Sequence, residues 1–500
     1  MEIRLARMPI PDGAAASHLL AMDGTTSPLS RPLVLPCGAT LQNRLAKAAM
    51  SEGMADADNH VTPRLVELYR RWARSGAGLL LSGNMQVDRD HLERPGNVVL
   101  DGTSGAEALA ELAEAGKADG AHFWAQISHT GRQVSRSINA EPLAPSSVKL
   151  DFQLRFAGYV FGRPREMTTN DIAKAIDQFA FAARQARAAG FTGVQLHGAH
   201  GYLISQFLSP RVNRRTDDWG GSLQNRSRFL FEVLAAVRAA VGPGFPIGLK
   251  LNASDFEVGG FTNAECVEIV RSLDGHGLDL LELSGGSLEQ PKVVGAALRD
   301  QGVDGLRATR EQREAYFIEL AGAVKATAAM PVMVTGGFRT ASAMNAALEA
   351  GQLDLIGLGR PLVTDPLTPA RLLRGETSAA PSPERDLAVF HQLGWFSIQL
   401  ERLADGLDAD RSLGGADATR MFKEIEAQTT AALLARRRNA APLPQSFARD
   451  LASRLRKTHP GETALARLGR GIFRALRRPL DGLVDLLKHA LVNRARRRFG

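Results

Sequence analysis

Residues 190–202 read Gly-Phe-Thr-Gly-Val-Gln-Leu-His-Gly-Ala-His-Gly-Tyr, and this segment is the most informative part of the 500-residue chain. Its apolar first half predicts a short buried strand, and His197, His200 and Tyr202 follow where that strand ends. In an α/β barrel the catalytic groups lie on loops beyond the carboxyl ends of the strands, so the segment fits the rim of such a barrel. Two imidazoles three residues apart can donate to one oxygen, and a nearby phenol can supply a proton. These side chains therefore suit the polarisation of a carbonyl and the protonation of a carbon beside it.

Short runs rich in Leu, Val and Ile alternate with helical stretches between residues 32 and 373. The runs show little strict alternation of apolar and polar residues, as expected for parallel strands buried on both faces. We expect strands at residues 44–50, 78–86, 121–127, 193–197, 246–251, 278–284, 331–335 and 354–358. Because each is followed by enough chain for a helix, the predicted fold is α/β, a (β/α)8 TIM barrel. A doubly wound sheet is the alternative, but no Gly-x-Gly-x-x-Gly motif follows an early strand.

The helical periodicity predicts two barrel helices and two later ones, at residues 171–189, 227–241, 385–403 and 419–437. Residues 168–170, Thr-Thr-Asn, are candidates for the N-cap of the first helix. Trp395 and Phe396 form a pair that looks exposed on the third helix. We expect this pair to pack the helix against the barrel or a neighbouring subunit and not to contact substrate.

The chain is divided into an N-terminal arm (1–30), a barrel (31–375), an α-helical C-terminal extension (376–440) and a basic amphipathic helical tail (441–500). Residues 436–500 carry 17 Lys+Arg and 4 Asp+Glu, a net charge of +13, which leaves −5 for the rest. This asymmetry indicates an anionic partner for the tail. Its apolar residues at helical spacing also suit docking on the barrel or another subunit, or contact with an anionic membrane surface. Nucleic acid is disfavoured, because aromatic side chains for base stacking are nearly absent.

The two cysteines, Cys37 and Cys266, are too few for a Cys-rich iron–sulfur or zinc site and indicate no disulfide framework. The N-terminus lacks the apolar run of about 7–15 residues that a signal peptide needs. No window approaches the roughly 18 uninterrupted apolar residues of a membrane span. We therefore expect a cytoplasmic protein, with the tail as the part that could touch a membrane. A homo-oligomer is left open.

Two glycine-bearing segments follow the last two predicted strands, one containing Gly336 and Gly337 and the other Gly359 and Arg360. The loops after strands 7 and 8 are the usual phosphate site of a (β/α)8 enzyme. Small residues let backbone N–H groups approach the anion, and an arginine can bind it through two hydrogen bonds. The alternative is that both segments are only tight turns, but their pairing at strands 7 and 8 favours phosphate.

A longer motif string supports a family assignment. Residues 197–202, 206–210, 213–222 and 225–226 closely resemble the Old Yellow Enzyme family of FMN-dependent NAD(P)H oxidoreductases. Further matching segments occur in the family's order, at residues 41–44, 48–51, 125–132 and 250–255, together with the two glycine segments. The resemblance covers about residues 32–370.

The resemblance implies that the barrel, residues 31–375, binds FMN. It places near the cofactor Ala48, Ala49, Met50, Ser51, Asn84, Gln126, Lys250, Gly336, Gly337, Gly359 and Arg360. Lys250 would neutralise the electron-rich pyrimidine edge of reduced FMN, where many members have arginine. Ser51 stands where some relatives carry a cysteine or threonine that tunes the flavin potential.

The family's reaction is hydride transfer from NADH or NADPH to FMN, and then to the β-carbon of an α,β-unsaturated carbonyl compound. His197 and His200 would hold the carbonyl oxygen, and Tyr202 would protonate the α-carbon. Three alternatives stay open: a flavin dehydrogenase, an NAD(P)H oxidase that uses another electron acceptor, and a degenerate barrel whose tail binds a membrane or a partner. The substrate is an enone-like small molecule in the main hypothesis.

Several polar residues have simpler interpretations. The two histidines of the motif lack a third ligand at suitable spacing, so no metal site is predicted. His129 is expected to be structural, and Asp217 and Asp218 to form a local network that shapes their loop. Fused relatives carry a cysteine cluster past the barrel for an iron–sulfur centre, whereas no cysteine follows Cys266 here, so no such cluster is expected.

Overall fold

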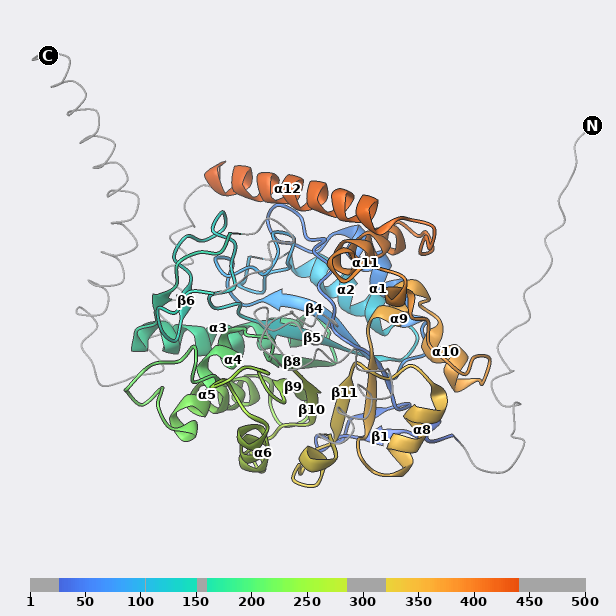
Figure 1. Ribbon diagram of the computed structural model, residues 1–500, viewed down its shortest axis with the longest axis horizontal. Helices are drawn as coiled ribbons and strands as arrows, with labels where there is room; N and C mark the ends of the chain where they lie inside the picture. Colours follow the sequence, from blue (N-terminus) through green and yellow to red (C-terminus); the bar gives the residue numbers. More distant parts are fainter. Residues whose placement is uncertain (1–26, 104, 151–159, 286–320, 440–500) are drawn as a thin grey trace, which may run out of the picture. The chain divides into compact units, whose positions relative to one another are not determined.

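The computed structural model describes residues 27–103, 105–150, 160–285 and 321–439 (Figure 1). Its centre is a closed barrel of parallel strands in the order β10-β11-β12-β3-β4-β5-β8-β9. The strands are β3 (Leu45–Lys47), β4 (Leu79–Gln86), β5 (His122–Ser128), β8 (Gly193–Gly198), β9 (Ile247–Asn252), β10 (Leu280–Ser284), β11 (Val332–Thr335) and β12 (Leu355–Leu358). Pairing of β12 with β3 closes the ring. The predicted (β/α)8 barrel is confirmed, and the doubly wound sheet is excluded.

Helices that follow the barrel strands along the chain surround the barrel (Figure 1). They are α1 (Pro63–Ala73), α2 (Ala106–Lys117), α3 (Thr169–Ala188), α4 (Leu203–Leu208), α5 (Leu223–Val241), α6 (Asn263–Ser272), α8 (Ala341–Glu349), α9 (Arg360–Thr364) and α10 (Thr368–Leu373). Thr168 caps α3 as predicted, in a capping box with Asp171. Helix α5 begins four residues earlier than expected, because the Ser222 side chain caps it by accepting from the Asn225 amide.

The amino-terminal end of the barrel is filled by apolar side chains. A two-stranded antiparallel ribbon, β1 (Leu33–Val34) and β2 (Thr40–Leu41), precedes the barrel. Leu33 and Leu41 pack with residues near the starts of several strands, including Leu79 and Leu280. Before the ribbon, the short 3-10 helix η1 (Pro28–Ser30) is anchored by buried Leu29. A further short pair, β6 (Leu143–Ala144) and β7 (Arg165–Glu166), lies outside the barrel sheet. Since apolar groups occupy this end, polar chemistry is concentrated at the other.

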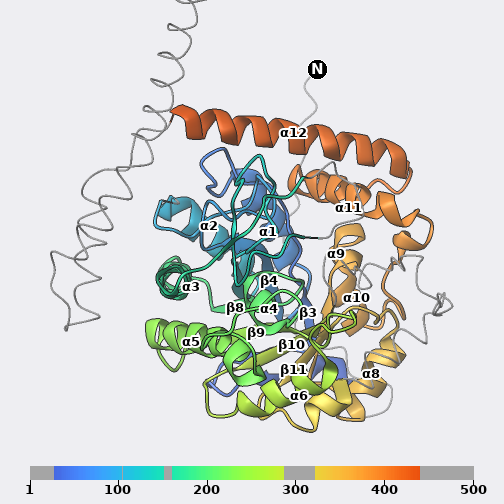
Figure 2. The same ribbon diagram turned by 60° about the vertical axis from the view of Figure 1, so that its left-hand side comes forward.

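The helical extension consists of the 3-10 helix η3 (Pro383–Arg385), α11 (Val389–Ala404) and α12 (Gly415–Asn439). Figure 2 shows α12 running across the α11 side of the barrel. The expectation that Trp395 and Phe396 are exposed is wrong, since they are 2% and 9% exposed. The Trp395 indole donates to the Leu413 carbonyl at 3.0 Å, and the Arg360 guanidinium lies 5.5 Å from the Phe396 ring centroid. The pair packs the extension against the barrel, as predicted.

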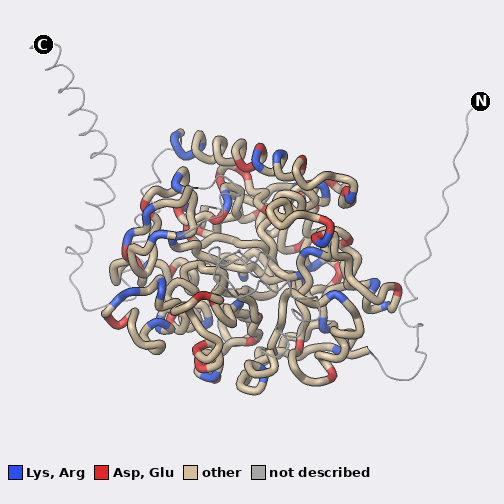
Figure 3. The backbone as a smooth tube through the Cα atoms, viewed as in Figure 1, with Lys and Arg blue, Asp and Glu red and all other residues tan. Residues whose placement is uncertain are grey.

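Residues 437–500 form a second unit, separate from residues 1–436. Of that unit the structure describes only the last residues of α12, so the predicted tail helices and their partners lie outside the described residues. On the described part, Lys and Arg are interspersed with Asp and Glu (Figure 3). Among the described helices, none combines the length and apolar character needed to cross a membrane.

Candidate active site

The carboxyl ends of the strands bring together the three residues first singled out from the sequence. The ring of His197 meets the ring of His200 edge-on, with centroids 5.0 Å apart and planes at 75°. It also meets the Tyr202 ring, with centroids 4.7 Å apart and planes at 89°. Two imidazoles and a phenol are therefore held as one packed group at the carboxyl end of β8.

His197 is held as a neutral hydrogen-bond donor. It lies in β8 and is 3% exposed. Its Nδ1 accepts from the Ala199 backbone N–H at 3.3 Å, which leaves the proton on Nε2. Burial holds the pKa of His197 well below its usual range, and the nearby His200 and Lys250 add to the effect. A neutral imidazole with Nε2–H can polarise an oxygen without carrying a charge of its own.

His200 adopts an uncommon backbone conformation, with φ of 60°. Its N–H donates to Asn252 Oδ1 at 3.1 Å, and its carbonyl accepts from Gln133 Nε2 at 2.8 Å. Its own Nε2 lies 2.7 Å from Ser284 Oγ. Burial, and then Lys250, lower the pKa of His200 to about 3. Contacts from several strands thus hold a strained residue in place, a pattern found at functional sites.

Tyr202 immediately precedes α4 and is 7% exposed. Burial raises the pKa of its phenol well above the usual value, and Glu93, which is hydrogen-bonded to it, adds to the rise. The same carboxylate accepts from Ser51 Oγ at 2.6 Å and from Asn84 Nδ2. The structure therefore joins the predicted proton donor to two predicted cofactor residues through Glu93.

Sequence reasoning did not identify Glu93. It lies in the loop after β4, where several charged residues occur without periodicity, so no local pattern distinguishes it. The only available signal was position, because the loop follows a barrel strand at its carboxyl end. Asn84, which the resemblance placed near the cofactor, is 6% exposed and its Oδ1 has no hydrogen-bond partner among the described residues. An unpaired buried oxygen of this kind is consistent with a bound ligand.

The segment 48–51 continues directly from β3 along the rim. The Ala48 N–H donates to the Leu358 carbonyl of β12 at 2.9 Å. A Cβ added to Gly359 would lie 3.5 Å from Met50 Sδ, so the loops after β3 and β12 touch. The structure thus brings Ala48, Ala49, Met50 and Ser51 alongside one of the two glycine segments.

Lys250 and Gln126 lie on the inner surface of the barrel, close to the histidines. The register pairs Lys250 with His197 across β8 and β9. The Lys250 ammonium is 2.9 Å from Glu282 Oε1, and both side chains are buried. Gln126 Nε2 donates to Gln195 Oε1 at 2.7 Å. Glu282 and Gln195 are further polar residues of the site that the sequence patterns did not identify.

The two glycine segments lie at the ends of β11 and β12, as predicted. Gly336 and Gly337 have φ of 101° and 85°, in the left-handed region that favours glycine. Arg339 pairs with Glu384 at 2.6 Å, whereas Arg360 has no ion pair or hydrogen bond from its guanidinium in the described parts of the chain. Burial lowers the pKa of Arg360. A half-buried guanidinium that forms no ion pair with the described residues, beside glycine turns, fits the phosphate of a mononucleotide.

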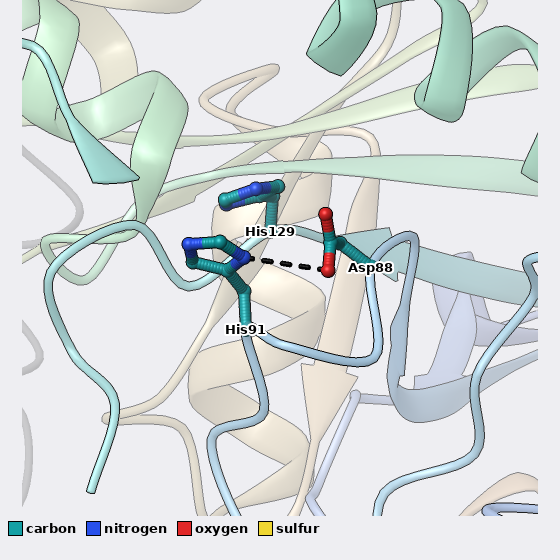
Figure 4. Close-up of side chains that lie close together, drawn as sticks. All are labelled: Asp88, His91 and His129. Atoms are coloured by element: carbon teal, nitrogen blue, oxygen red, sulfur yellow. Dashed lines mark ion pairs between the residues drawn. The ribbon is translucent and has the colours of Figure 1, made fainter. Parts of the chain in front are cut away.

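Asp88, His91 and His129 form a cluster of potential metal ligands, whose ligand atoms all lie within 4.8 Å of one another (Figure 4). However, His91 Nε2 accepts from the Leu143 N–H at 2.9 Å, and His129 Nδ1 accepts from the Gly131 N–H at 3.0 Å. Each neutral ring therefore carries its proton on the other nitrogen, and His91 Nδ1 faces Asp88 at 3.4 Å. A protonated ring nitrogen has no lone pair for a cation. These hydrogen bonds favour a structural role for the cluster, and the structural role of His129 stays a prediction.

Sequence and structure comparisons agree with this geometry. The sequence model of the NADH:flavin oxidoreductase / NADH oxidase family matches residues 29–378. The chain belongs to this family. Its cofactors are accordingly FMN and NADH.

Curated relatives include the NADH-dependent flavin oxidoreductase of Talaromyces variabilis, which is 35% identical over 68% of this chain and 85% of its own length. A Neonectria enzyme with the same description is 36% identical over 71% of this chain, and the match spans 48% of that longer protein. The NADH oxidase of Thermoanaerobacter brockii is 34% identical over 67% of this chain and 49% of its own length.

Among solved structures, 2-naphthoyl-CoA reductase in complex with 2-naphthoyl-CoA matches with a TM-score of 0.65 and 27% identity, over 76% of this chain and 58% of that one. An Old Yellow Enzyme homologue from Zymomonas mobilis matches with a TM-score of 0.58 and 24% identity, over 71% of this chain and 94% of that one. The second match supports the fold alone.

Proposed function

We propose that this flavin oxidoreductase reduces a carbon–carbon double bond conjugated to a carbonyl group, with NADH as the electron donor and Tyr202 as the proton donor. The observation that carries the proposal is the packed group of His197, His200 and Tyr202 at the carboxyl end of β8. Neutral imidazoles and a protonated phenol are the states that this reaction requires, and the surroundings favour those states.

The two histidines would hold the substrate's carbonyl oxygen. His197 donates from Nε2, because its Nδ1 is occupied by a backbone N–H. His200 is positioned by its contact with Ser284 and by its constrained backbone. Hydrogen bonds to the carbonyl oxygen draw electron density away from the conjugated carbon, which stabilises the charge that develops on that oxygen.

The residues at the barrel mouth fit FMN. Gly336, Gly337, Gly359 and Arg360 would hold its phosphate, and Lys250 with Gln126 would contact its ring. When bound, FMN supplies the hydride chemistry. Tyr202 then delivers a proton to the carbon beside the carbonyl, and Glu93, hydrogen-bonded to the phenol, orients it. Burial of these side chains limits the access of water to the reacting atoms.

The proposal is tested with the holoenzyme, wild type and Tyr202→Phe, in separated half-reactions. NADH should reduce FMN at similar rates in both, whereas oxidation of reduced FMN by an enone should slow about 100-fold or more in the variant. Binding of the enone to oxidised enzyme should change little. Equal oxidation rates in the two proteins would rule out the proton role.

A second candidate is NADH oxidation with oxygen as acceptor, since a 34%-identical relative is named an NADH oxidase. Molecular oxygen has no carbonyl group for the two histidines to bind. Replacing His197 and His200 by asparagine should therefore leave oxygen consumption nearly unchanged. Enone reduction should fall strongly in the same variant. If aerobic NADH turnover exceeds every enone rate in wild type, the oxidase function is favoured.

A further inference from the structure

A line of buried polar side chains crosses the inside of the barrel just below the strand ends. Gln126, Gln195, Glu282 and Lys250 come from four different strands, and each is at most 3% exposed. The strand registers set Gln126 opposite Gln195, and Glu282 opposite Lys250. These four residues are called the barrel network below.

The barrel network has a defined hydrogen-bond direction. Glu282 as a carboxylate can only accept, so Gln195 donates to its Oε2 through Nε2 at 2.7 Å. The carbonyl of Gln195 then accepts from Gln126 Nε2 at 2.7 Å. The side-chain carbonyl oxygen of Gln126 has no hydrogen bond to the described residues, so it is left as an acceptor for a bound group. Glu282 therefore determines which atom Gln126 presents.

The other end of the barrel network is an ion pair. Lys250 Nζ and Glu282 Oε1 are 2.9 Å apart, with side-chain exposures of 4% and 0%. A buried ammonium without a counter-charge is costly, so Glu282 holds Lys250 in place. The same carboxylate offsets part of the positive potential that Lys250 projects into the site. Lys250 acts on the histidines as well, since it lowers the pKa of both.

We propose that Glu282 is a positioning residue that sets the reduction potential of the flavin, by partly neutralising Lys250 and by orienting Gln126 through Gln195. This inference rests on the proposed placement of Lys250 and Gln126 at the flavin ring. A cation near the ring favours the anionic reduced form, and a carboxylate paired with that cation opposes it. The flavin should therefore be harder to reduce than it would be beside a Lys250 without a partner carboxylate.

The experiment measures the ratio of reduced to oxidised FMN in the full-length holoenzyme, equilibrated anaerobically with a reference dye. Glu282→Gln should raise this ratio about tenfold at a fixed dye potential, which corresponds to about 30 mV for a two-electron couple. Lys250→Met should lower it by a similar factor. The double variant Glu282→Gln/Lys250→Met should stay within about threefold of wild type, because it removes both charges together.

Asp279→Asn is the matched control. Asp279 is also a buried carboxylate in an ion pair, with Arg238 at 2.6 Å, but it precedes β10 at the opposite end of that strand from the site. The control should leave the FMN ratio unchanged. An unchanged ratio in Glu282→Gln, or an equal shift in Asp279→Asn, would overturn the proposal.

Failure of a single variant to fold still leaves a decisive measurement. No buried charge is left unpaired in the double variant, so it should fold even where a single variant does not. A double variant that departs more than tenfold from the wild-type ratio contradicts the proposal. A response to Lys250→Met with none to Glu282→Gln would refute the role of Glu282 alone, whereas unchanged turnover in Tyr202→Phe refutes the proposed reaction.

Discussion

At the scale of single residues, Glu93 is the side chain that the structure joins to the phenol of Tyr202. In the proposed reaction Tyr202 must stay protonated until it gives its proton to substrate, and a carboxylate hydrogen-bonded to the phenol favours that protonated state. Ser51 and Asn84 hold the same carboxylate in place. The pKa of the proposed proton donor is therefore raised by a residue about a hundred positions earlier in the chain.

Glu93→Gln should lower the pKa of Tyr202 by about one unit or more, because it removes the adjacent negative charge. The ultraviolet difference spectrum of tyrosinate formation measures this change, and the chain has 4 tyrosines, so Tyr202→Phe identifies the signal. Glu67→Gln, at an exposed carboxylate paired with Arg70, is the control. Identical titrations in Glu93→Gln and wild type would show that the carboxylate does not act on the phenol.

At the scale of elements, α12 is tied to the loop after β3. The Arg94 guanidinium pairs with Glu426 of α12 at 2.7 Å, and it also donates to the carbonyls of Ser51 at 3.0 Å and Glu52 at 3.2 Å. The Arg94–Glu426 pair is buried, with side-chain exposures of 8% and 9%. The helical extension, which lies beyond the family's matched region, therefore supports the segment expected to contact FMN.

Glu426→Ala should lower the free energy of unfolding by about 3 kcal/mol, because it leaves the buried guanidinium of Arg94 without its counter-charge. Asp58→Asn removes an exposed ion pair between the same helix and the barrel, the one to Arg436, and should cost less than about 1 kcal/mol. Urea unfolding measures both. FMN should also dissociate faster from Glu426→Ala. Equal losses in the two variants would mean that the buried pair has no special role.

Strand β4 contains an irregularity that serves the site. Its register with β5 shifts between Leu81 and Asn84, and the intervening Gly83 donates to Glu52 Oε1 at 2.9 Å. A Cβ on Gly83 would lie 2.0 Å from Glu52 Oε2 and 2.4 Å from the Met50 carbonyl. The loop after β3 can approach β4 only because this residue is glycine.

Gly83→Ala should therefore destabilise the protein by about 1–3 kcal/mol, as overpacking does. Gly244→Ala is the control, since a Cβ there would meet nothing within 4 Å. That variant should stay within about 0.5 kcal/mol of wild type. Thermal or urea unfolding separates the two, and a Gly83→Ala protein as stable as wild type would refute the steric argument.

At the scale of the whole molecule, the stability should depend on pH through buried neutral histidines. Burial is the largest cause that lowers the pKa of His129, His197 and His200. In the unfolded chain these groups bind protons below about pH 6.5, whereas in the folded protein they stay neutral. Their contribution to stability is thus fully present above about pH 6.5. It is lost as the pH falls from there toward the folded pKa values, by about 1.4 kcal/mol per pH unit for each histidine.

Urea unfolding between about pH 6 and pH 5 tests this expectation. His129→Asn should reduce the slope of the unfolding free energy against pH by the contribution of one bound proton, about 1.4 kcal/mol per pH unit. Replacing the exposed His276 by glutamine should leave the slope unchanged. Asp88 does not act in this window, because its pKa lies well below the usual carboxyl value and its contribution is lost only at lower pH. A flat stability profile in wild type would contradict the assignment of neutral histidines.

The sequence alone was sufficient for features that depend on near neighbours in the chain. The eight strands could be predicted from their apolar runs, and the Thr168 cap from the residues that follow it, because both patterns are local. The grouping of His197, His200 and Tyr202 is also local, since one strand end carries all three. The glycine segments could be placed in the same way, because the carboxyl ends of parallel strands share one edge.

Only the tertiary structure revealed Glu93 beside Tyr202, Glu282 beside Lys250 and Glu426 beside Arg94. It also overturned the expectation that Trp395 and Phe396 are exposed. Each of these partners is brought in from another strand, loop or helix, so no spacing in the sequence marks it. A charged residue in a loop or on a helix has the same local pattern whether it is solvated or paired in the interior. Burial and counter-charge are properties of the folded barrel, because they depend on which distant segments close around the side chain.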